Sequence, residues 1–280
     1  MGKKRKHRKG RFIISSILSF LLSILLTVAT VALAIRAGFI NESRILDGLN
    51  YKDYYSGVEA QFYQDAKDLS TPMGLPENVL DGIVDSDTIH EDVRGYVSAA
   101  FQGKQYTFHT DELEQSLTDH IYRYFQEQGW QLTQEQLTTI PEYTEMISDK
   151  YVEDLKVPLV NHFDKINRNY TKIMVLGITG CLILSAVIIF VLIRMYRWKH
   201  RAIRFVIYST LAAAIMTAVP AVVVLVSGFY KRISIEMEYM YHAVVQYITN
   251  GFMVFIYMSC AWVAVSVGLL LFIRYLKKNS

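Results

Sequence analysis

The sequence has few cysteines, and none of them lies in its polar parts. Cys181 and Cys260 are the only two among 280 residues, and both fall inside apolar runs. A disulfide within the polar segments and a cysteine nucleophile there are therefore excluded. A polar domain in an oxidising compartment must then be held by its own hydrophobic core. This favours a bacterial plasma membrane over the surface of a eukaryotic cell.

Ionisable side chains are missing from four long apolar runs, residues 12–35, 173–193, 205–229 and 252–273, which contain no Asp, Glu, Lys, Arg or His. Each run has 21–25 residues, enough for a helix that crosses the ~30 Å hydrocarbon core of a bilayer. Because charged groups inside spans usually mark ion or proton paths, their absence argues against transport.

Acidic residues are missing from three short polar segments. Residues 1–11, 194–204 and 274–280 together carry 15 Lys and Arg and no Asp or Glu. Residues 36–172 carry 12 Lys and Arg against 24 Asp and Glu, and residues 230–251 carry 2 against 2. Short basic segments stay in the cytoplasm, so both termini are predicted inside and the acidic segment outside.

These patterns predict an all-α membrane protein with four transmembrane helices in a compact bundle. One mostly helical extracytoplasmic domain is inserted between helices 1 and 2. The expected order is a basic cytoplasmic arm (1–11), transmembrane helix 1 (12–36), the extracytoplasmic domain (37–171), transmembrane helix 2 (172–193), a basic cytoplasmic loop (194–204), transmembrane helix 3 (205–229), an amphipathic external loop (230–251), transmembrane helix 4 (252–273) and a cytoplasmic tail (274–280).

The first apolar run also resembles a secretory signal, since Ala32-Leu33-Ala34 offers a small-x-small cleavage pattern. Its 24 residues exceed the ~7–15 of a signal h-region, so we expect it to be retained as an anchor. Cleavage would leave three spans and an external N-terminus.

Small residues recur at intervals of four in every apolar run, where they let helices approach closely in lipid. We expect these stripes to form the bundle or to bind partner spans. They are Ser15, Ser19, Ser23 and Thr27; Gly177, Cys181 and Ser185; Ser209, Ala213, Thr217 and Ala221; and Cys260, Ala264 and Gly268.

Apolar periodicity predicts helices over residues 43–69, 76–84, 88–101 and 110–128, with Gly129 closing the last. Thr88-x-x-Glu91 matches a capping box, and Pro141 is expected to interrupt the chain. Residues 233–248 are amphipathic at helical spacing. This segment is predicted either to dock under the external domain or to extend the fourth span.

The densest ionisable cluster of the acidic domain contains Asp81 and Asp92 together with the candidate cation ligands Asp85, Asp87, His90 and Glu91. Asp85-Ser86-Asp87 is similar to the start of a calcium loop, but the turn glycine and the closing glutamate are missing. Helix capping explains these acids equally well. His90, His109, His120 and His162 lack the spacing of a zinc site. We therefore expect no cofactor.

Three functions remain open. The first is a binding protein, sensor-like or an accessory subunit, because polar cytoplasmic segments of 11, 11 and 7 residues cannot fold into an output domain. The second is an external hydrolase that brings together two or more of Asp85, Asp87, His90, Glu91 and His109. The third is a small transporter. Expected partners are anionic lipid headgroups at the basic N-terminus and another membrane protein, with no nucleic acid. The acidic exterior favours cations, basic peptides or a protein.

Overall fold

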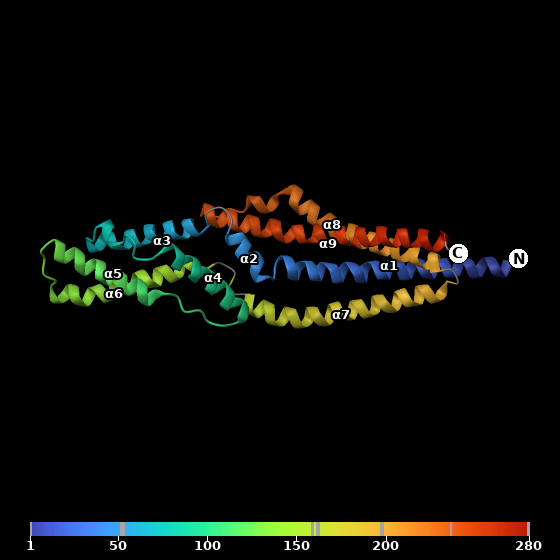
Figure 1. Ribbon diagram of the computed structural model, residues 1–280, viewed down its shortest axis with the longest axis horizontal. Helices are drawn as coiled ribbons and strands as arrows, with labels where there is room; N and C mark the ends of the chain where they lie inside the picture. Colours follow the sequence, from blue (N-terminus) through green and yellow to red (C-terminus); the bar gives the residue numbers. More distant parts are fainter. Residues whose placement is uncertain are drawn as a thin grey trace. The chain divides into compact units, whose positions relative to one another are not determined.

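The computed structural model describes residues 2–50, 54–157, 160, 163–196, 199–235 and 237–278, which contain helices and no strand (Figure 1). The helices are α1 (Gly2–Gly38), α2 (Glu42–Leu49), α3 (Tyr54–Ser70), α4 (Ser86–Gln102), α5 (Thr110–Glu127), α6 (Gln134–Leu155), α7 (Phe163–Met195), α8 (Lys199–Ser227) and α9 (Glu238–Lys278), with short 3-10 turns at Thr71–Met73, Glu77–Val79 and Phe229–Arg232. His162 lies outside the described residues.

The chain divides into two compact units. The apolar unit takes the described residues of 1–44, 168–234 and 245–280, and the polar unit takes those of 45–167 and 235–244. Four stretches are long and apolar enough to cross a membrane. They are Gly10–Gly38 of α1, Thr171–Met195 of α7, His200–Arg232 of α8 and the 3-10 turn that follows it, and Glu238–Tyr275 of α9. The four predicted apolar runs lie inside these stretches, so the prediction of four candidate membrane-spanning helices is confirmed.

In the apolar unit, α1 and α8 pack through their small residues. The hydroxyls of Ser19 and Ser209 lie 2.9 Å apart, and Ser209 also donates to the Ser19 carbonyl at 2.8 Å. Ser15, Ala213 and Thr217 are buried in the same stripes. Such close approach is what small side chains permit between helices in lipid. The stripes predicted on the first and third spans are therefore confirmed as packing faces.

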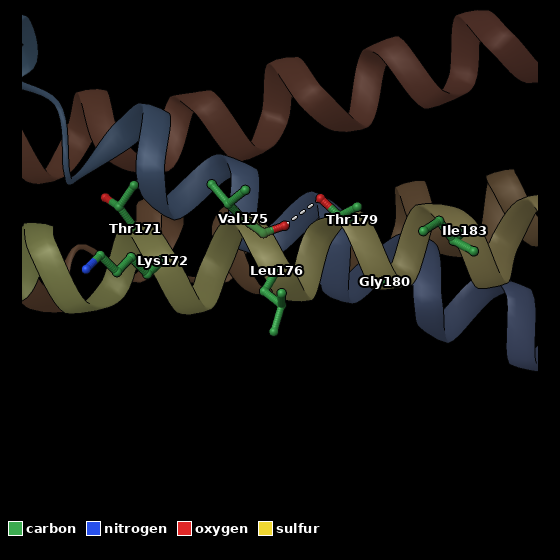
Figure 2. Close-up of a pocket in the computed structure, with 7 residues that line it drawn as sticks. All are labelled: Thr171, Lys172, Val175, Leu176, Thr179, Gly180 and Ile183. Carbon is green, nitrogen blue, oxygen red and sulfur yellow. Dashed lines mark hydrogen bonds between the residues drawn. The ribbon is translucent and has the colours of Figure 1, made fainter.

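The stripe of small residues predicted on α7 is buried only at Ser185, near the C-terminal end of the stripe. Ser185 is buried, but a Cβ at Gly177 or Gly180 would meet nothing within 4 Å. The side chains around these glycines belong to α7 alone, and Leu176 among them is 80 % exposed (Figure 2). Residues 171–183 of α7 thus present an open apolar face. The predicted bundle contact of this stripe is absent at Gly177, and the alternative of a partner span stays a prediction.

The stripe predicted on α9 also faces away from the bundle, since Cys260 is exposed and Gly268 borders open space. A different face makes the contacts: Trp262 donates its indole N–H to Thr30 at 2.7 Å, and Ser266 bonds to Thr210 at 2.7 Å. Polar side chains in lipid need hydrogen-bond partners, so Trp262 and Ser266 face the bundle and the small-residue stripe faces away.

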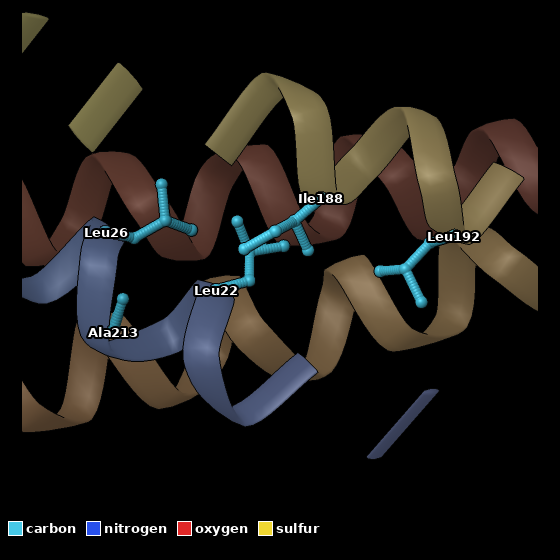
Figure 3. Packing of buried hydrophobic residues seen from close by; sticks show 5 residues of the cluster. All are labelled: Leu22, Leu26, Ile188, Leu192 and Ala213. Carbon is cyan, nitrogen blue, oxygen red and sulfur yellow. The ribbon is translucent and has the colours of Figure 1, made fainter. Parts of the chain in front are cut away.

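Aliphatic side chains from three helices fill the centre of the apolar unit (Figure 3). The buried cluster consists of Leu22 and Leu26 of α1, Ile188 and Leu192 of α7, and Ala213 of α8. Trp262 of α9 packs against this cluster. The end of α7 is therefore joined to the bundle, in contrast to the open face of residues 171–183.

In the polar unit, α4 and α5 match the predicted helices closely, and Gly129 adopts a left-handed φ of 68° just after α5. Two other predictions are wrong. The helix expected over residues 43–69 is replaced by α2 and α3, and that over 76–84 shrinks to the 3-10 turn Glu77–Val79. Gly82, with a φ of 71°, ends any continuation of this turn.

Two predictions from local sequence patterns, at Pro141 and at Thr88, differ from the structure. Pro141 lies inside α6 instead of interrupting the chain, and α6 starts with a capping box formed by Thr133 and Gln136. The capping box expected at Thr88 is wrong, because α4 already begins at Ser86 with Asp85 as its N-cap residue. The Thr-x-x-Gln pattern of α6 was visible in the sequence.

The amphipathic segment before the fourth span extends that span, as predicted, because α9 begins at Glu238. Its first turn also packs inside the polar unit, where the rings of Tyr239 and Tyr54 lie 5.5 Å apart, edge to face. A Cβ at Gly57 would come within 2.4 Å of the Tyr239 ring. The glycine is therefore needed for this close contact.

Candidate functional site

Three of the four candidate cation ligands, Asp87, His90 and Glu91, lie on α4, and Asp85 is its N-cap residue, but their surroundings differ. Asp85, Asp87 and Glu91 are exposed, whereas His90 stacks on Tyr55 with ring centroids 3.7 Å apart. Among the described residues, no group of three His, Cys, Asp or Glu side chains is placed to hold a metal ion. The cation site stays a prediction that this arrangement does not support.

Asp92, the next residue of α4, is buried with 0 % of its surface exposed. Its carboxylate accepts hydrogen bonds from the hydroxyls of Tyr106 and Tyr151 at 2.9 and 2.6 Å. The ring Nδ1 of His109 lies 2.6 Å from Oδ1, and the backbone N–H of His109 donates to Oδ2 at 3.3 Å. The donors come from α6 and from the segment before α5. Asp92 therefore holds three parts of the polar unit together.

The charge of this cluster affects its partners. The hydrogen bond to Asp92 raises the pKa of His109 above its usual 6.5, so the imidazolium form is favoured. Burial and then the bond to Asp92 raise the pKa of both Tyr106 and Tyr151, which keeps these hydroxyls protonated as donors. With donors on both oxygens, the carboxylate is satisfied despite its burial.

Helical spacing could have identified Asp92 as buried. It lies three residues after Ile89 and four before Tyr96, both on the buried face of α4. In the sequence, however, Asp92 stands among acids that the structure places on the exposed surface, such as Asp87 and Glu91. Of the predicted hydrolase residues, only Glu91 contributes with Asp92 and Glu112 to the charges that act on His109. The hydrolase constellation therefore stays a prediction.

Beside Asp92, the end of α4, the segment that follows it and the residue after α6 enclose a hollow of about 410 Å³. It is lined by Tyr96, Ala100, Gly103, Lys104, Gln105, Tyr106, Phe108 and Lys156. The Phe108 ring lies 5.6 Å from Tyr96 and 5.1 Å from Tyr106. Because Tyr106 also donates to Asp92, the buried carboxylate fixes one wall of the hollow.

A left-handed turn at Gly103, with a φ of 67°, directs the chain from α4 into this wall. The N–H of Lys104 donates to the Ala99 carbonyl at 2.9 Å, and that of Gly103 to the Ala100 carbonyl at 3.2 Å. This closure satisfies carbonyls that the end of a helix leaves free. The hollow therefore has a defined backbone frame.

A second buried charge cluster joins α3 and α6. The Lys150 ammonium lies 3.1 Å from a carboxylate oxygen of Asp65 and 3.1 Å from one of Asp154. The Asp154 side chain is 6 % exposed, and its Oδ2 has no hydrogen-bond partner. Burial raises the pKa of Asp154 to about 6, although Lys150 opposes this shift.

Asp154 should make the polar unit less stable as the pH rises. Its pKa is about 6 when folded against an ordinary 3.8, so the folded state binds more protons between these values. The contribution of Asp154 to stability is then largest below about pH 4 and is lost as the pH rises through 6, a fall of about 3 kcal/mol. In Asp154→Asn, we expect this fall to disappear from thermal unfolding followed by circular dichroism between pH 4 and 7. Glu153→Gln, at an exposed acid 3.4 Å from Lys150, is the matched control and should retain it.

Comparison with protein-family models, with curated proteins and with solved structures found no match to this chain. The fold therefore defines the class by itself. Over the described residues the fold is all-helical, with four helices long and apolar enough to span a membrane, as in a multipass membrane protein, and a separate polar helical unit.

Proposed function

We propose that this chain is a multipass protein of a cell membrane, bacterial by its lack of cysteines in polar segments, whose polar unit lies outside the cytoplasm. In this topology both termini are cytoplasmic and the polar unit is inserted between the first and second spans. The charge distribution supports it, since residues 1–11, 194–204 and 274–280, which would be cytoplasmic, carry 15 bases and no acid.

The polar unit is proposed to bind a ligand, in a sensor-like role. The hollow next to Asp92 carries this proposal, because its wall is fixed by hydrogen bonds from Tyr106 and His109 to a buried carboxylate. A site that is formed before the ligand arrives loses less entropy on binding. Among the described residues, those that line the hollow include no carboxylate, histidine, serine or cysteine. That composition favours binding over hydrolysis.

We further propose that the chain acts as an accessory subunit beside another membrane protein. The open face of α7 around Gly177 and that of α9 around Gly268 support this role. Small residues on a lipid-facing helix let a neighbouring span approach closely. The basic segment 1–11 would contact anionic headgroups on the cytoplasmic side.

Cysteine labelling tests the sidedness. In a Cys181→Ala, Cys260→Ala background, Gln126→Cys places a thiol on an exposed position of α5, and Arg201→Cys places one near the start of α8. In intact bacterial cells, a membrane-impermeant maleimide should label position 126 at once and position 201 only after permeabilisation. The reverse pattern would show the polar unit to be cytoplasmic and would refute the proposal.

A further inference from the structure

We infer that the hollow beside Asp92 binds a small organic anion, a phosphate or carboxylate group attached to a flat apolar body. This inference rests on the proposed binding function and adds the class of ligand. Its two charged lining residues, Lys104 and Lys156, are both basic, and the other lining residues include three aromatic rings. An anion and an aromatic body are the complements of these groups.

The positive charge of the hollow stands out against its surroundings. Residues 45–167 contain 8 Lys and Arg but 23 Asp and Glu. Lys67 and Lys150 each form ion pairs with acids, whereas Lys104 and Lys156 form none within the part of the chain that the structure describes. Two ammonium groups without a described acidic partner, in so acidic a unit, attract an anion to this place and repel cations from it.

Each lysine lies at the C-terminal end of a helix, which is a common place for a basic residue. This does not explain why both lysines line the same hollow. Lys104 follows the C-terminus of α4, and Lys156 is the C-cap residue of α6, where the helix dipole favours a basic residue. At the end of α4, however, backbone N–H groups already bond to the carbonyls of Ala99 and Ala100. The Lys104 ammonium is therefore left for a ligand.

The three aromatic rings of the hollow indicate the apolar part of the ligand. Tyr96 and Phe108 are tilted against each other, and Tyr106 meets Phe108 edge to face. Because the Tyr106 hydroxyl is bonded to Asp92, its ring contributes apolar surface to the hollow. A volume of about 410 Å³ lies in the range of small-molecule sites. One or two fused rings, with the anionic group at the lysines, match this space and polarity.

Isothermal titration calorimetry of the full chain in detergent tests the inference, with 2-naphthyl phosphate as the probe. We expect saturable binding of one molecule per chain that weakens at higher salt concentration. The uncharged 2-naphthol and inorganic phosphate should each bind at least tenfold more weakly, because a hydrogen bond to a charged group contributes about 1.5–3 kcal/mol.

The lysines supply the matched variants. Lys104→Met with Lys156→Met should weaken binding of 2-naphthyl phosphate at least tenfold, whereas Lys67→Met, at a lysine paired with Glu77, should leave it unchanged. Both lysines of the hollow are exposed, so the double variant is expected to fold.

Three results would each overturn the inference: no saturable binding to the wild type, equal binding of 2-naphthol or of inorganic phosphate, or a double variant that binds as the wild type does. External labelling of position 126 would still stand in that case, which separates this failure from failure of the proposed topology.

Discussion

Asp92→Ala should lower the free energy of unfolding of the polar unit by about 3–5 kcal/mol, the range for removing one partner of a buried, paired charge. The substitution leaves the hydroxyls of Tyr106 and Tyr151 and two N–H groups of His109 without their acceptor. Each unsatisfied buried donor costs about 1–3 kcal/mol unless water reaches it. Hydrogen exchange of the full chain in detergent measures the effect.

In Asp92→Ala, hydrogen exchange should increase most in residues 103–109. Binding of 2-naphthyl phosphate should be lost, because Tyr106 in the wall of the hollow is no longer held by Asp92. The helices of the apolar unit should exchange as slowly as in the wild type. Asp119→Ala, at an exposed acid in the middle of α5, is the matched control. Equal protection of residues 103–109 in both variants would show that Asp92 does not hold this segment.

Gly95→Val should destabilise the same region by about 2–4 kcal/mol, combining overpacking with the loss of one hydrogen bond. A Cβ at position 95 would lie 2.3 Å from Cε2 of Tyr106, so the ring must move away from α4 and from Asp92. This is opposite to the usual gain when glycine is replaced inside a helix. Thermal unfolding of the full chain provides the measurement.

A double-mutant cycle identifies the cause. Tyr106→Ala removes the ring with which the valine collides, so Gly95→Val should cost at least 1 kcal/mol less in that background than in the wild type. If the two losses simply add, the contact between Gly95 and Tyr106 is not the reason that position 95 is glycine.

Much of the fold follows from local patterns in the sequence. Hydropathy predicts the four long apolar helices, and the period of apolar residues predicts α4 and α5. Small residues predict the packing face that α1 and α8 share, where Ser19 meets Ser209. In each case the pattern that carries the prediction lies among residues close together in the sequence.

The candidate site depends on contacts that local patterns do not contain. Tyr106, His109 and Tyr151 lie 14, 17 and 59 residues from Asp92, and nothing near position 92 indicates that these donors converge on it. The spacing of α4 shows only that Asp92 shares the face of Ile89 and Tyr96. The orientation of α9 was missed for the same reason, because it depends on the distant partners of Trp262 and Ser266.

Asp92 is the residue on which the wall of the proposed site depends, and the titration of His109 reports on it most directly. The Cε1–H resonance of His109 can be assigned by its loss in His109→Gln and followed by NMR from pH 5 to 9. In the wild type the pKa should lie above 6.5, because Asp92 favours the imidazolium, and in Asp92→Asn it should fall. A wild-type pKa at or below 6.5, or one that Asp92→Asn leaves unchanged, would contradict the role of Asp92.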